Sequence, residues 1–339
     1  MKVLFLFNYP TWNKVYDGLL PSNQLFGIKE ATIRVERNEK NEVTRAILKN
    51  GYCDFLYLPN VGGGRFKSFL KVLVRSFKYD VIYDGINCVG NTYGVFHKLF
   101  PSTKLVSVLH HPPFTKLVKY AKFDHIIFFT EQLLDLAKSD KPSISNISTY
   151  NEWQPDIDFY NKICPETFEI KYDVVDNGRT GRDYEILFKA LEKVNCTVFC
   201  FNQKIKNCNN NKIIFTNESW PSWYETISIL KQSRVILIPL KLNNGKLLGP
   251  FGATSFMDAI ALHKPVVCPS SASFAYLVKN RKLGVVYEDS ESLAKGLSDL
   301  KYNEKFYEEC VENMADYERE CSMKNYSDKV ISILDFVTK

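Results

Sequence analysis

The chain has 339 residues, and its 44 lysines and arginines exceed its 38 aspartates and glutamates by six. Hydrophobic residues make up 45% of the chain and charged residues 24%. This balance excludes a largely disordered protein, because enough apolar material is present to bury a core. A chain of this length predicts two domains.

Two features of the sequence indicate a cytoplasmic protein. The apolar run from Val3 to Phe7 is shorter than the apolar region of a signal peptide, and no run reaches the roughly 18 apolar residues of a membrane span. The nine cysteines are odd in number, and none falls in a Cys-x-x-Cys pair. Buried free thiols in a reducing compartment are the better interpretation of that pattern.

Short apolar runs alternate along the chain with longer amphipathic patterns. The apolar runs predict strands at Val3–Phe7, Asp54–Leu58, Asp80–Asp84, Leu105–Leu109, His125–Phe129, Asp173–Asp176, Thr197–Phe201, Lys212–Phe215, Val235–Pro239, Pro265–Cys268 and Gly284–Tyr287. The amphipathic patterns predict helices at Phe66–Phe77, Glu185–Lys193, Trp223–Gln232 and Ser255–Leu262, and helix throughout Glu304–Lys339. Unbroken apolar strands are typical of parallel sheets covered on both faces, so we predict an α/β protein.

The alternating series runs twice, which predicts two doubly wound, Rossmann-like domains. The polar, proline-containing stretch 141–165 between the two sets is the expected linker. We place the N-terminal domain at residues 1–165 and the C-terminal domain at residues 166–318. The helix at 319–339 is expected to pack back on the N-terminal domain. Two such domains facing one another predict a central cleft between them, at the carboxyl ends of the strands.

The stretch Asp176–Asp183, with the sequence Asp-Asn-Gly-Arg-Thr-Gly-Arg-Asp, joins a predicted strand to a predicted helix. Its glycines allow a tight turn, and the helix N-terminus that follows offers N–H groups. Arg179 and Arg182 add two guanidinium groups suited to phosphate. These features point to a diphosphate. The alternative interpretation is a strand-to-helix turn with solvated arginines.

A second helix N-terminus follows the predicted strand Val235–Pro239. Gly252 precedes a helix that begins near Thr254, which presents another site for an anion. Asp258 lies about one turn into that helix, where a carboxylate can accept hydrogen bonds from sugar hydroxyls. The alternative interpretation is an N-capping hydroxyl and an acid that the helix dipole favours.

Together these stretches resemble glycosyltransferases of the GT-B fold, family 4 and its relatives. Gly252–Val267 is similar to the family's Gly-…-Glu-Ala-Met-Ala-x-Gly-Lys-Pro-Val-Val pattern, and Asn177–Tyr184 to its Gly-Gly-Arg-Ser-x-Arg-Asp variant. Trp153–Phe159 is similar to the family's Gly-Val-Asp-x-x-x-Phe linker. The resemblance implies that residues 1–165 form the acceptor side and that residues 166–318 bind the donor nucleotide.

The resemblance also implies roles for residues of the C-terminal domain. Arg179 and Arg182, next to Gly178, match the basic pair that holds the donor diphosphate. Asp258 matches the glutamate that binds the ribose hydroxyls. We therefore expect Arg182→Ala to weaken donor binding more than it disturbs folding.

Two further parts of the donor site follow from the same resemblance. Gly252, Ala253 and Thr254 match the loop whose backbone N–H groups meet phosphate or the donor sugar. His110 and His111, after the predicted strand Leu105–Leu109, resemble the loop whose histidine touches the donor sugar, and of the two we prefer His111. The expected catalytic residues are His111, Arg179 and Arg182.

Three positions depart from the family pattern. Pro250 stands where the family usually carries a second glutamate, eight residues before the ribose acid. That acid is Asp258 here instead of glutamate, and His263 replaces the glycine before the Lys-Pro-Val-Val stretch. These departures keep open the alternative of a catalytically silent member.

The resemblance implies a hexosyltransferase-type glycosyltransferase (EC 2.4). Such an enzyme moves a sugar from a nucleoside diphosphate sugar to a glycan or lipid-linked acceptor with retention of configuration, here in surface polysaccharide or glycolipid assembly. Pre-oriented cations and N–H groups can stabilise the leaving diphosphate, so we expect no cofactor and no essential metal. The alternatives are a silent sugar-nucleotide-binding protein and a sugar-nucleotide epimerase of the same fold.

Positive charge is concentrated in residues 60–125, which carry ten lysines and arginines against three acidic residues. Lys67, Lys71, Arg75 and Lys78 are spaced for one face of a predicted helix. Its apolar residues are expected on the other face: Phe66, Phe69, Leu70, Leu73 and Phe77. The basic face predicts docking on anionic lipid at the inner face of the membrane, and the alternative is a core-packed helix with a solvated basic face. No recognition motif accompanies the charge, so we expect no nucleic-acid partner.

Overall fold

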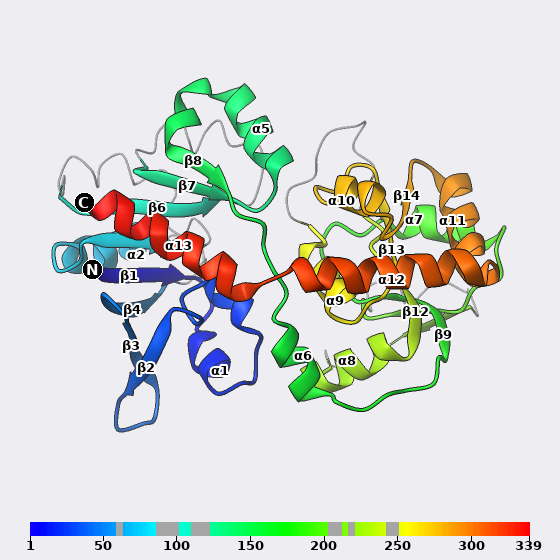
Figure 1. Cartoon of the computed structure of the whole chain (residues 1–339), viewed down its shortest axis with the longest axis horizontal. Helices are drawn as coiled ribbons and strands as arrows, with labels where there is room; N and C mark the ends of the chain where they lie inside the picture. The colour runs from blue at the N-terminus through cyan, green and yellow to red at the C-terminus, as the bar shows by residue number, and fades with distance from the viewer. Residues whose placement is uncertain (59–63, 86–101, 110–122, 203–211, 216–220, 242–250) are drawn as a thin grey trace. The chain divides into compact units, whose positions relative to one another are not determined.

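The computed structural model describes residues 1–58, 64–85, 102–109, 123–202, 212–215, 221–241 and 251–339; for 64–69 it describes the backbone alone. The chain divides into two compact units (Figure 1). The first unit contains Met1–Gln154 and Ser322–Lys339, and the second contains Pro155–Cys321. Among the described residues, no helix has the length and apolar character needed to cross a bilayer.

The boundaries between the units differ from those expected at residues 165 and 318. The chain first passes from the first unit to the second after Gln154, because the helix α6 (Ile157–Ile163) packs within the second unit. The expected linker 141–165 is therefore not a linker throughout: it contains the short helix η3 (Pro142–Ile147) and the strand β8 (Ser148–Tyr150) of the first unit. The chain returns to the first unit after Cys321.

The first unit is built on one eight-stranded sheet with the order β2-β3-β4-β1-β5-β6-β7-β8. Its strands are β1 (Lys2–Phe7), β2 (Thr32–Arg37), β3 (Val43–Leu48), β4 (Gly51–Tyr57), β5 (Val81–Asp84), β6 (Lys104–Leu109), β7 (His125–Phe128) and β8. The strands β2 and β3 pair antiparallel at one edge, and β4, β1 and β5 to β8 are parallel.

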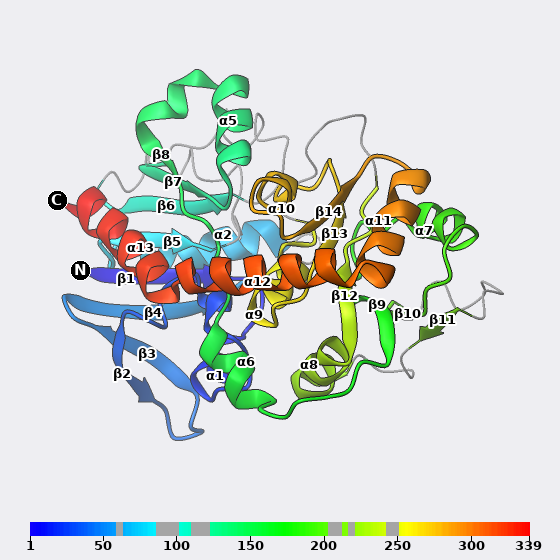
Figure 2. The ribbon, with the colours of Figure 1, turned by 45° about the vertical axis from the view of Figure 1, so that its right-hand side comes forward.

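The two faces of this sheet bury different side chains. One face packs aliphatic residues against the helices α2 (Gly64–Ser76) and α5 (Glu131–Asp140). The other face carries aromatic rings and is covered by the short helices α1 (Trp12–Tyr16) and η1 (Ser22–Leu25) and by the terminal helix α13 (Met323–Thr338) (Figures 1 and 2). Trp153 stacks on Phe129 at 5.1 Å between ring centroids and donates its indole N–H to the Asn23 carbonyl at 3.0 Å. The last residues before the crossing are thus anchored in the first unit.

The second unit is built on a six-stranded sheet with the order β11-β10-β9-β12-β13-β14, and every pair is parallel. Its strands are β9 (Tyr172–Asp176), β10 (Val198–Cys200), β11 (Ile213–Phe215), β12 (Ser233–Leu237), β13 (Val266–Pro269) and β14 (Gly284–Tyr287). The chain runs outward from β9 through β10 to β11 and then returns to β12 on the other side of β9. The order therefore reverses between β9 and β12, which in an open α/β sheet marks a ligand crevice at the carboxyl ends of the strands.

Helices cover both faces of the second sheet. The helices α7 (Tyr184–Leu191), α11 (Ser290–Tyr302) and α12 (Glu304–Glu320) contribute to the larger core, and α8 (Trp223–Lys231) and α9 (Ala253–Ala261) pack on β12. The helix α6 packs against α8, and α10 (Ala275–Asn280) against β13 and β14.

All eleven predicted strands are present, and three strands were not predicted. In β2 and β3 charged residues interrupt the apolar pattern, and β8 has three residues. The prediction of unbroken helix over 304–339 is wrong. The helix α12 ends at Glu320, and α13 starts afresh where the Ser322 side chain accepts a hydrogen bond from the Asn325 N–H at 3.1 Å.

Candidate functional site

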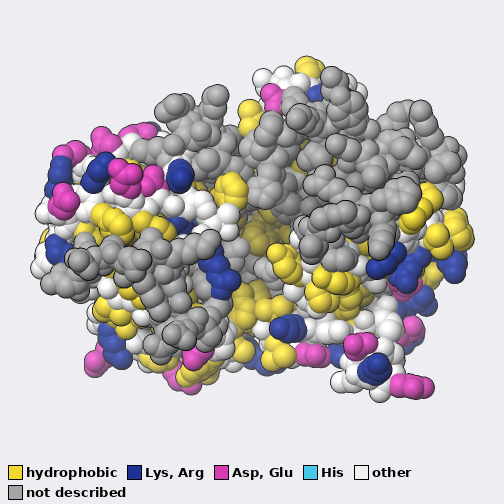
Figure 3. All heavy atoms as spheres, turned by 180° about the vertical axis from the view of Figure 1, so that it is seen from behind, with side chains coloured by type: hydrophobic (Ala, Val, Ile, Leu, Met, Phe, Trp, Pro, Cys, Tyr) yellow, Lys and Arg dark blue, Asp and Glu magenta, His cyan; other side chains and the backbone are white. Residues whose placement is uncertain are grey.

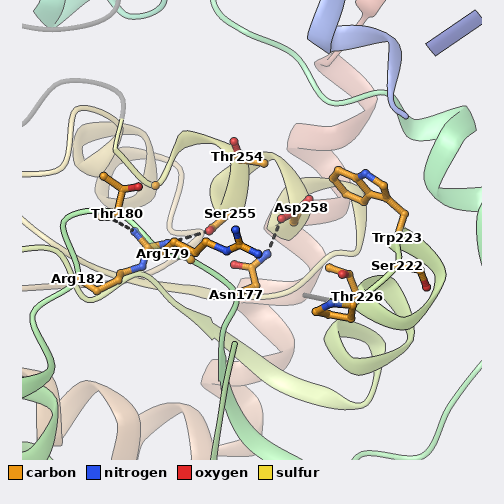
Figure 4. Close-up of a pocket in the computed structure, with 13 residues that line it drawn as sticks. Asn177, Arg179, Thr180, Arg182, Ser222, Trp223, Thr226, Thr254, Ser255 and Asp258 are labelled. Carbon is orange, nitrogen blue, oxygen red and sulfur yellow. Dashed lines mark hydrogen bonds between the residues drawn. The ribbon is translucent and has the colours of Figure 1, made fainter. Parts of the chain in front are cut away.

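A pocket of about 460 Å³ opens in the second unit at the carboxyl ends of β9 and β12, where the strand order reverses (Figure 4). It is lined by Asn177, Gly178, Arg179, Thr180, Arg182, Pro221, Ser222, Trp223, Thr226, Gly252, Thr254, Ser255 and Asp258. The first five belong to the turn between β9 and α7, the next four lie at and before the start of α8, and the last four belong to the start of α9. The topology of the sheet therefore brings the two predicted anion-binding stretches together.

The carboxylate of Asp176, the last residue of β9, organises the turn beneath the pocket. It is fully buried and accepts hydrogen bonds from the Gly178 N–H at 3.0 Å, from Arg182 Nε at 2.9 Å and from the Tyr184 hydroxyl at 2.8 Å. One side chain thereby fixes the path of the chain from the strand to the helix α7. Asp176 was not among the residues predicted for the site, although an acid that ends an apolar strand is a signal in the sequence that could have marked it.

Arg182 is enclosed within this turn. Its side chain is only 3% exposed, and a second guanidinium nitrogen, Nη2, donates to the hydroxyl of Ser255 on α9 at 3.0 Å. The guanidinium lies so close to Gly178 that a Cβ on that glycine would stand 1.5 Å from Nη2. Gly178 is therefore required for a close approach, and Arg182 ties the turn to α9. The alternative interpretation of a solvated arginine therefore does not hold for Arg182, whose charge is paired with Asp176 inside the turn.

Arg179 is the exposed arginine of the pair. It lines the same pocket, and its carbonyl accepts a hydrogen bond from Asn202 Nδ2 at 3.4 Å. Figure 4 shows both arginines extending from the turn toward the side of the pocket formed by α9. An exposed guanidinium at the rim can follow an incoming anion, whereas a buried and paired one is held in place.

The N-terminus of α9 forms the opposite wall. Gly252 precedes the helix in the left-handed region, at φ 81°, and a Cβ there would meet Ile238 Cγ2 at 2.4 Å. Among the described residues no side chain caps the helix, and no acid lies in its first turn, so the N–H groups of Ala253, Thr254 and Ser255 stand at its positive end. Thr254 and Ser255 line the pocket, and Ala253 begins the helix beside them.

Asp258 lies one turn further along α9 and is 1% exposed. The Tyr160 hydroxyl, from α6, donates to its Oδ1, and Asn177 Nδ2 donates to its Oδ2 at 2.5 Å. Burial raises the pKa of Asp258 to about 6, although both hydrogen bonds favour the charged form and oppose the rise. Both carboxylate oxygens are thus already engaged within the protein.

The remaining predicted positions are less informative. His111 and Pro250 lie outside the described residues. His263 has φ 50°, in the left-handed region that favours glycine, which accounts physically for the family's glycine at that place. Trp223 and Thr226 were missed, since their placement depends on where α8 begins relative to the pocket and no motif marks it.

The architecture has close counterparts among solved structures. HepE from Anabaena, in complex with UDP, superposes with a TM-score of 0.66 at 13% identity, over 99% of this chain and 100% of that one. Sucrose-phosphate synthase from Thermosynechococcus elongatus gives 0.69 at 10% identity, over 99% of both chains. The Escherichia coli trehalose-6-phosphate structure bound with UDP-2-fluoro glucose gives 0.63 at 13%, over 98% and 99%. The chain has the GT-B fold.

The comparisons by sequence do not assign the chain to a family. A scan against protein-family models finds no match, and neither does a search of curated proteins. At 10–13% identity the structural likeness establishes the fold, and the residues of the pocket must carry any argument about activity.

The ion pair replaces our expectation for Arg182. Arg182→Ala leaves the buried Asp176 carboxylate without its cation, so we expect the free energy of unfolding to fall by about 3–5 kcal/mol in urea titrations. Arg179→Ala, in the same turn but exposed, is the matched control and should stay within about 0.5 kcal/mol of the wild type. Adding Asp176→Asn should recover part of the loss. An Arg182→Ala protein with the wild-type urea midpoint would show that the ion pair does not hold the turn.

The raised pKa of Asp258 makes a prediction about pH. Between the ordinary value of 3.8 and about 6, the folded protein keeps a proton that the unfolded chain has lost, so this group favours folding at low pH and that benefit disappears above pH 6. Asp258→Asn does not titrate there. Its stability relative to the wild type should therefore rise by about 2–3 kcal/mol from pH 4 to pH 7. A difference that is constant with pH in urea unfolding would contradict the assignment.

Proposed function

We propose that the chain is a glycosyltransferase that moves a sugar from a nucleoside diphosphate sugar to a glycan or lipid-linked acceptor. The observation that carries the proposal is the convergence of the α9 N-terminus and Arg179 on one pocket at the switch point of the second sheet. Helix N-termini and guanidinium groups are the usual partners of phosphate oxygens. HepE, which shares the fold, is recorded in complexes with UDP and with UDP-glucose, which supports a nucleotide-sugar donor for this chain as well.

The same groups supply the chemistry that the reaction needs. Breaking the bond between the anomeric carbon and the diphosphate oxygen builds negative charge on the leaving diphosphate. Donors that are already oriented stabilise that charge without reorganisation in the transition state. The network of Asp176 and Arg182 fixes the backbone of the turn that carries Arg179 and ties that turn to the start of α9.

Retention of configuration, independence from metal, hexosyl transfer and a role in polysaccharide or glycolipid assembly belong to the proposal through the family resemblance. Among the described residues, no three His, Cys, Asp or Glu side chains gather where they could hold a metal ion. His111 and Arg179 keep their proposed catalytic assignments, and Arg182, also assigned as catalytic from the resemblance, is proposed as a positioning residue that fixes the turn. A silent nucleotide-sugar-binding protein would use the same pocket and differ in turnover alone.

Nucleotide binding tests the donor site. We expect one of UDP, GDP and ADP, at 100 times its Kd, to stabilise the protein by about 2.7 kcal/mol, visible as a shift of several degrees in Tm and unaffected by EDTA. Arg179→Ala should weaken that nucleotide at least tenfold in calorimetry, since a charge-assisted hydrogen bond is worth about 1.5–3 kcal/mol. Absence of any shift would overturn the proposal. Binding without sugar release from the matching nucleotide sugar would select the silent protein.

The first unit also offers a surface for a membrane-borne acceptor. Three apolar side chains on one stripe of the described part of α2 and just beyond it face solvent: Leu70, Val74 and Phe77 are 39%, 62% and 61% exposed. We expected Leu70 and Phe77 on the face opposite the basic residues, and both are exposed to solvent, so the alternative of a core-packed apolar face does not hold for these two residues. The buried side of α2 is formed instead by residues such as Val72, which is 1% exposed and packs in the aliphatic core.

A basic stripe runs beside this apolar one. Lys71, Arg75 and Lys78 are exposed, whereas the side chain of Lys67 lies outside the described residues. Figure 3 shows lysine and arginine side chains next to hydrophobic ones on the surface of the first unit. Apolar and basic side chains side by side fit the boundary between headgroups and acyl chains of an anionic bilayer. We propose that this surface docks the enzyme on the membrane, in the cytoplasm.

Vesicle binding tests this surface. Lys71→Glu with Arg75→Glu should reduce cosedimentation with phosphatidylglycerol-containing vesicles more than tenfold in low salt, at roughly 1 kcal/mol per basic residue. Leu70→Ser with Val74→Ser should reduce it while leaving the salt dependence unchanged. The control is Lys324→Glu with Lys329→Glu, which makes the same charge change on α13. Equal binding by all variants would remove the membrane proposal and leave the donor site untouched.

A further inference from the structure

One buried polar atom in the pocket has no partner. Asn177 follows β9 directly, lines the pocket and is 8% exposed, and its Oδ1 accepts no hydrogen bond within the described part of the chain. An acceptor buried in this way is costly compared with a paired one, because it has lost its hydrogen bonds to water. The other unpartnered buried oxygens of the described residues, including the Tyr287 hydroxyl of the second unit, do not line this pocket.

The orientation of the Asn177 amide follows from its neighbour. An ionised carboxylate only accepts hydrogen bonds, so the group that faces Asp258 Oδ2 at 2.5 Å must be the NH₂ of Asn177. The other oxygen of Asp258 is occupied by the Tyr160 hydroxyl, which holds the carboxylate from α6. The amide oxygen is therefore turned away from Asp258, and an unpaired acceptor remains on the pocket side of the network (Figure 4).

The polarity of the pocket restricts what can pair with this oxygen. The α9 N-terminus and Arg179 offer donors and positive charge, which suit phosphate. Asn177 offers an acceptor next to the Asp258 carboxylate, which repels an anion and attracts a neutral hydroxyl or N–H. Trp223 lines this part of the pocket and packs on Tyr160, with ring centroids 6.2 Å apart. The ligand must then carry phosphate at one end and a neutral hydrogen-bond donor beside an apolar ring surface at the other.

We propose that Asn177 is a specificity-determining residue of the donor site. Its amide oxygen accepts a hydrogen bond from a hydroxyl or N–H of the nucleoside half of the donor, and Asp258 and Tyr160 are positioning residues that hold the amide in the accepting orientation. The proposal rests on the proposed function. It gives to Asn177 the hydroxyl contact that the family resemblance assigns to Asp258, because both oxygens of Asp258 are already engaged.

Calorimetry with two kinds of ligand tests the role of Asn177. The probes are the tightest binder among UDP, GDP and ADP, and inorganic pyrophosphate. Asn177→Ala should weaken the nucleoside diphosphate at least tenfold and pyrophosphate less than twofold, because only the nucleoside reaches Asn177. The matched control is Asn151→Ala, which removes a buried asparagine of the first unit whose Nδ2 donates to the Tyr326 carbonyl at 3.0 Å. It should lower Tm and leave both affinities within twofold.

A second measurement uses the wild-type protein and does not depend on the folding of a variant. The 2′-deoxy and 3′-deoxy forms of the nucleotide and a form methylated at the base N–H each remove one donor. One of them should bind at least tenfold more weakly than the parent, which identifies the donor as ribose hydroxyl or base. The same analogue should lose little further affinity in Asn177→Ala.

The positioning role of Asp258 has its own readout. In Asp258→Asn, the NH₂ of Asn177 no longer has to face residue 258. The difference in affinity between the parent nucleotide and the analogue that binds the wild type most weakly should therefore shrink, while the affinity for pyrophosphate stays the same. A merely structural role would lower Tm and change both ligands alike.

The outcomes separate the two proposals. A wild-type protein that binds none of the three nucleotides overturns the proposed function and this inference with it. A wild-type protein that binds a nucleotide, while Asn177→Ala loses no affinity or loses pyrophosphate equally, overturns this inference alone. The inference is also overturned if no analogue binds more weakly than the parent.

Discussion

The buried ion pair between Asp176 and Arg182 lies where the second sheet reverses its strand order, and the shape of the pocket depends on it. The Asp176 carboxylate also takes the Gly178 N–H and the Tyr184 hydroxyl, so it joins the end of β9 to the start of α7. Arg182 extends the same network to Ser255 on α9. Such a network is strong only while every member is paired, because burial makes an unpaired charge costly.

Two arginines that look equivalent in the sequence therefore do different work. The charge of Arg182 is neutralised by Asp176 within the protein. The guanidinium can approach the backbone this closely only because position 178 is glycine. Arg179 stands exposed at the rim, where its charge faces the space that a ligand would occupy. A rigid element and an adaptable one on the same turn combine preorganisation with the ability to close on an anion.

The pocket is also divided by hydrogen-bonding character. Donors gather at the start of α9, and an acceptor remains at Asn177, turned outward by Asp258. This division follows from one feature of the fold, since the carboxyl end of β9 lies beside the N-terminus of α9 at the switch point. In the first unit, the helix α2 likewise presents different side chains on different sides. One narrow side is buried in the core, and an apolar stripe and a basic stripe are exposed to solvent.

The sequence by itself determined the parallel α/β architecture, all eleven predicted strands and the two stretches that meet in the pocket. Unbroken apolar runs and glycine turns are local signals, and they survive folding because both faces of each sheet are covered.

Three things were decided by tertiary structure. The antiparallel strands β2 and β3 carry charge at an exposed edge, so their apolar pattern is weak. The helical pattern after residue 304 continues through a point where the chain changes units, and a break at Cys321 and Ser322 leaves the amphipathic period on both sides intact. The roles of Asp258 and Asn177 depend on which partners the sheet places within hydrogen-bond distance, and no spacing along the chain encodes a contact between residues 80 or more positions apart.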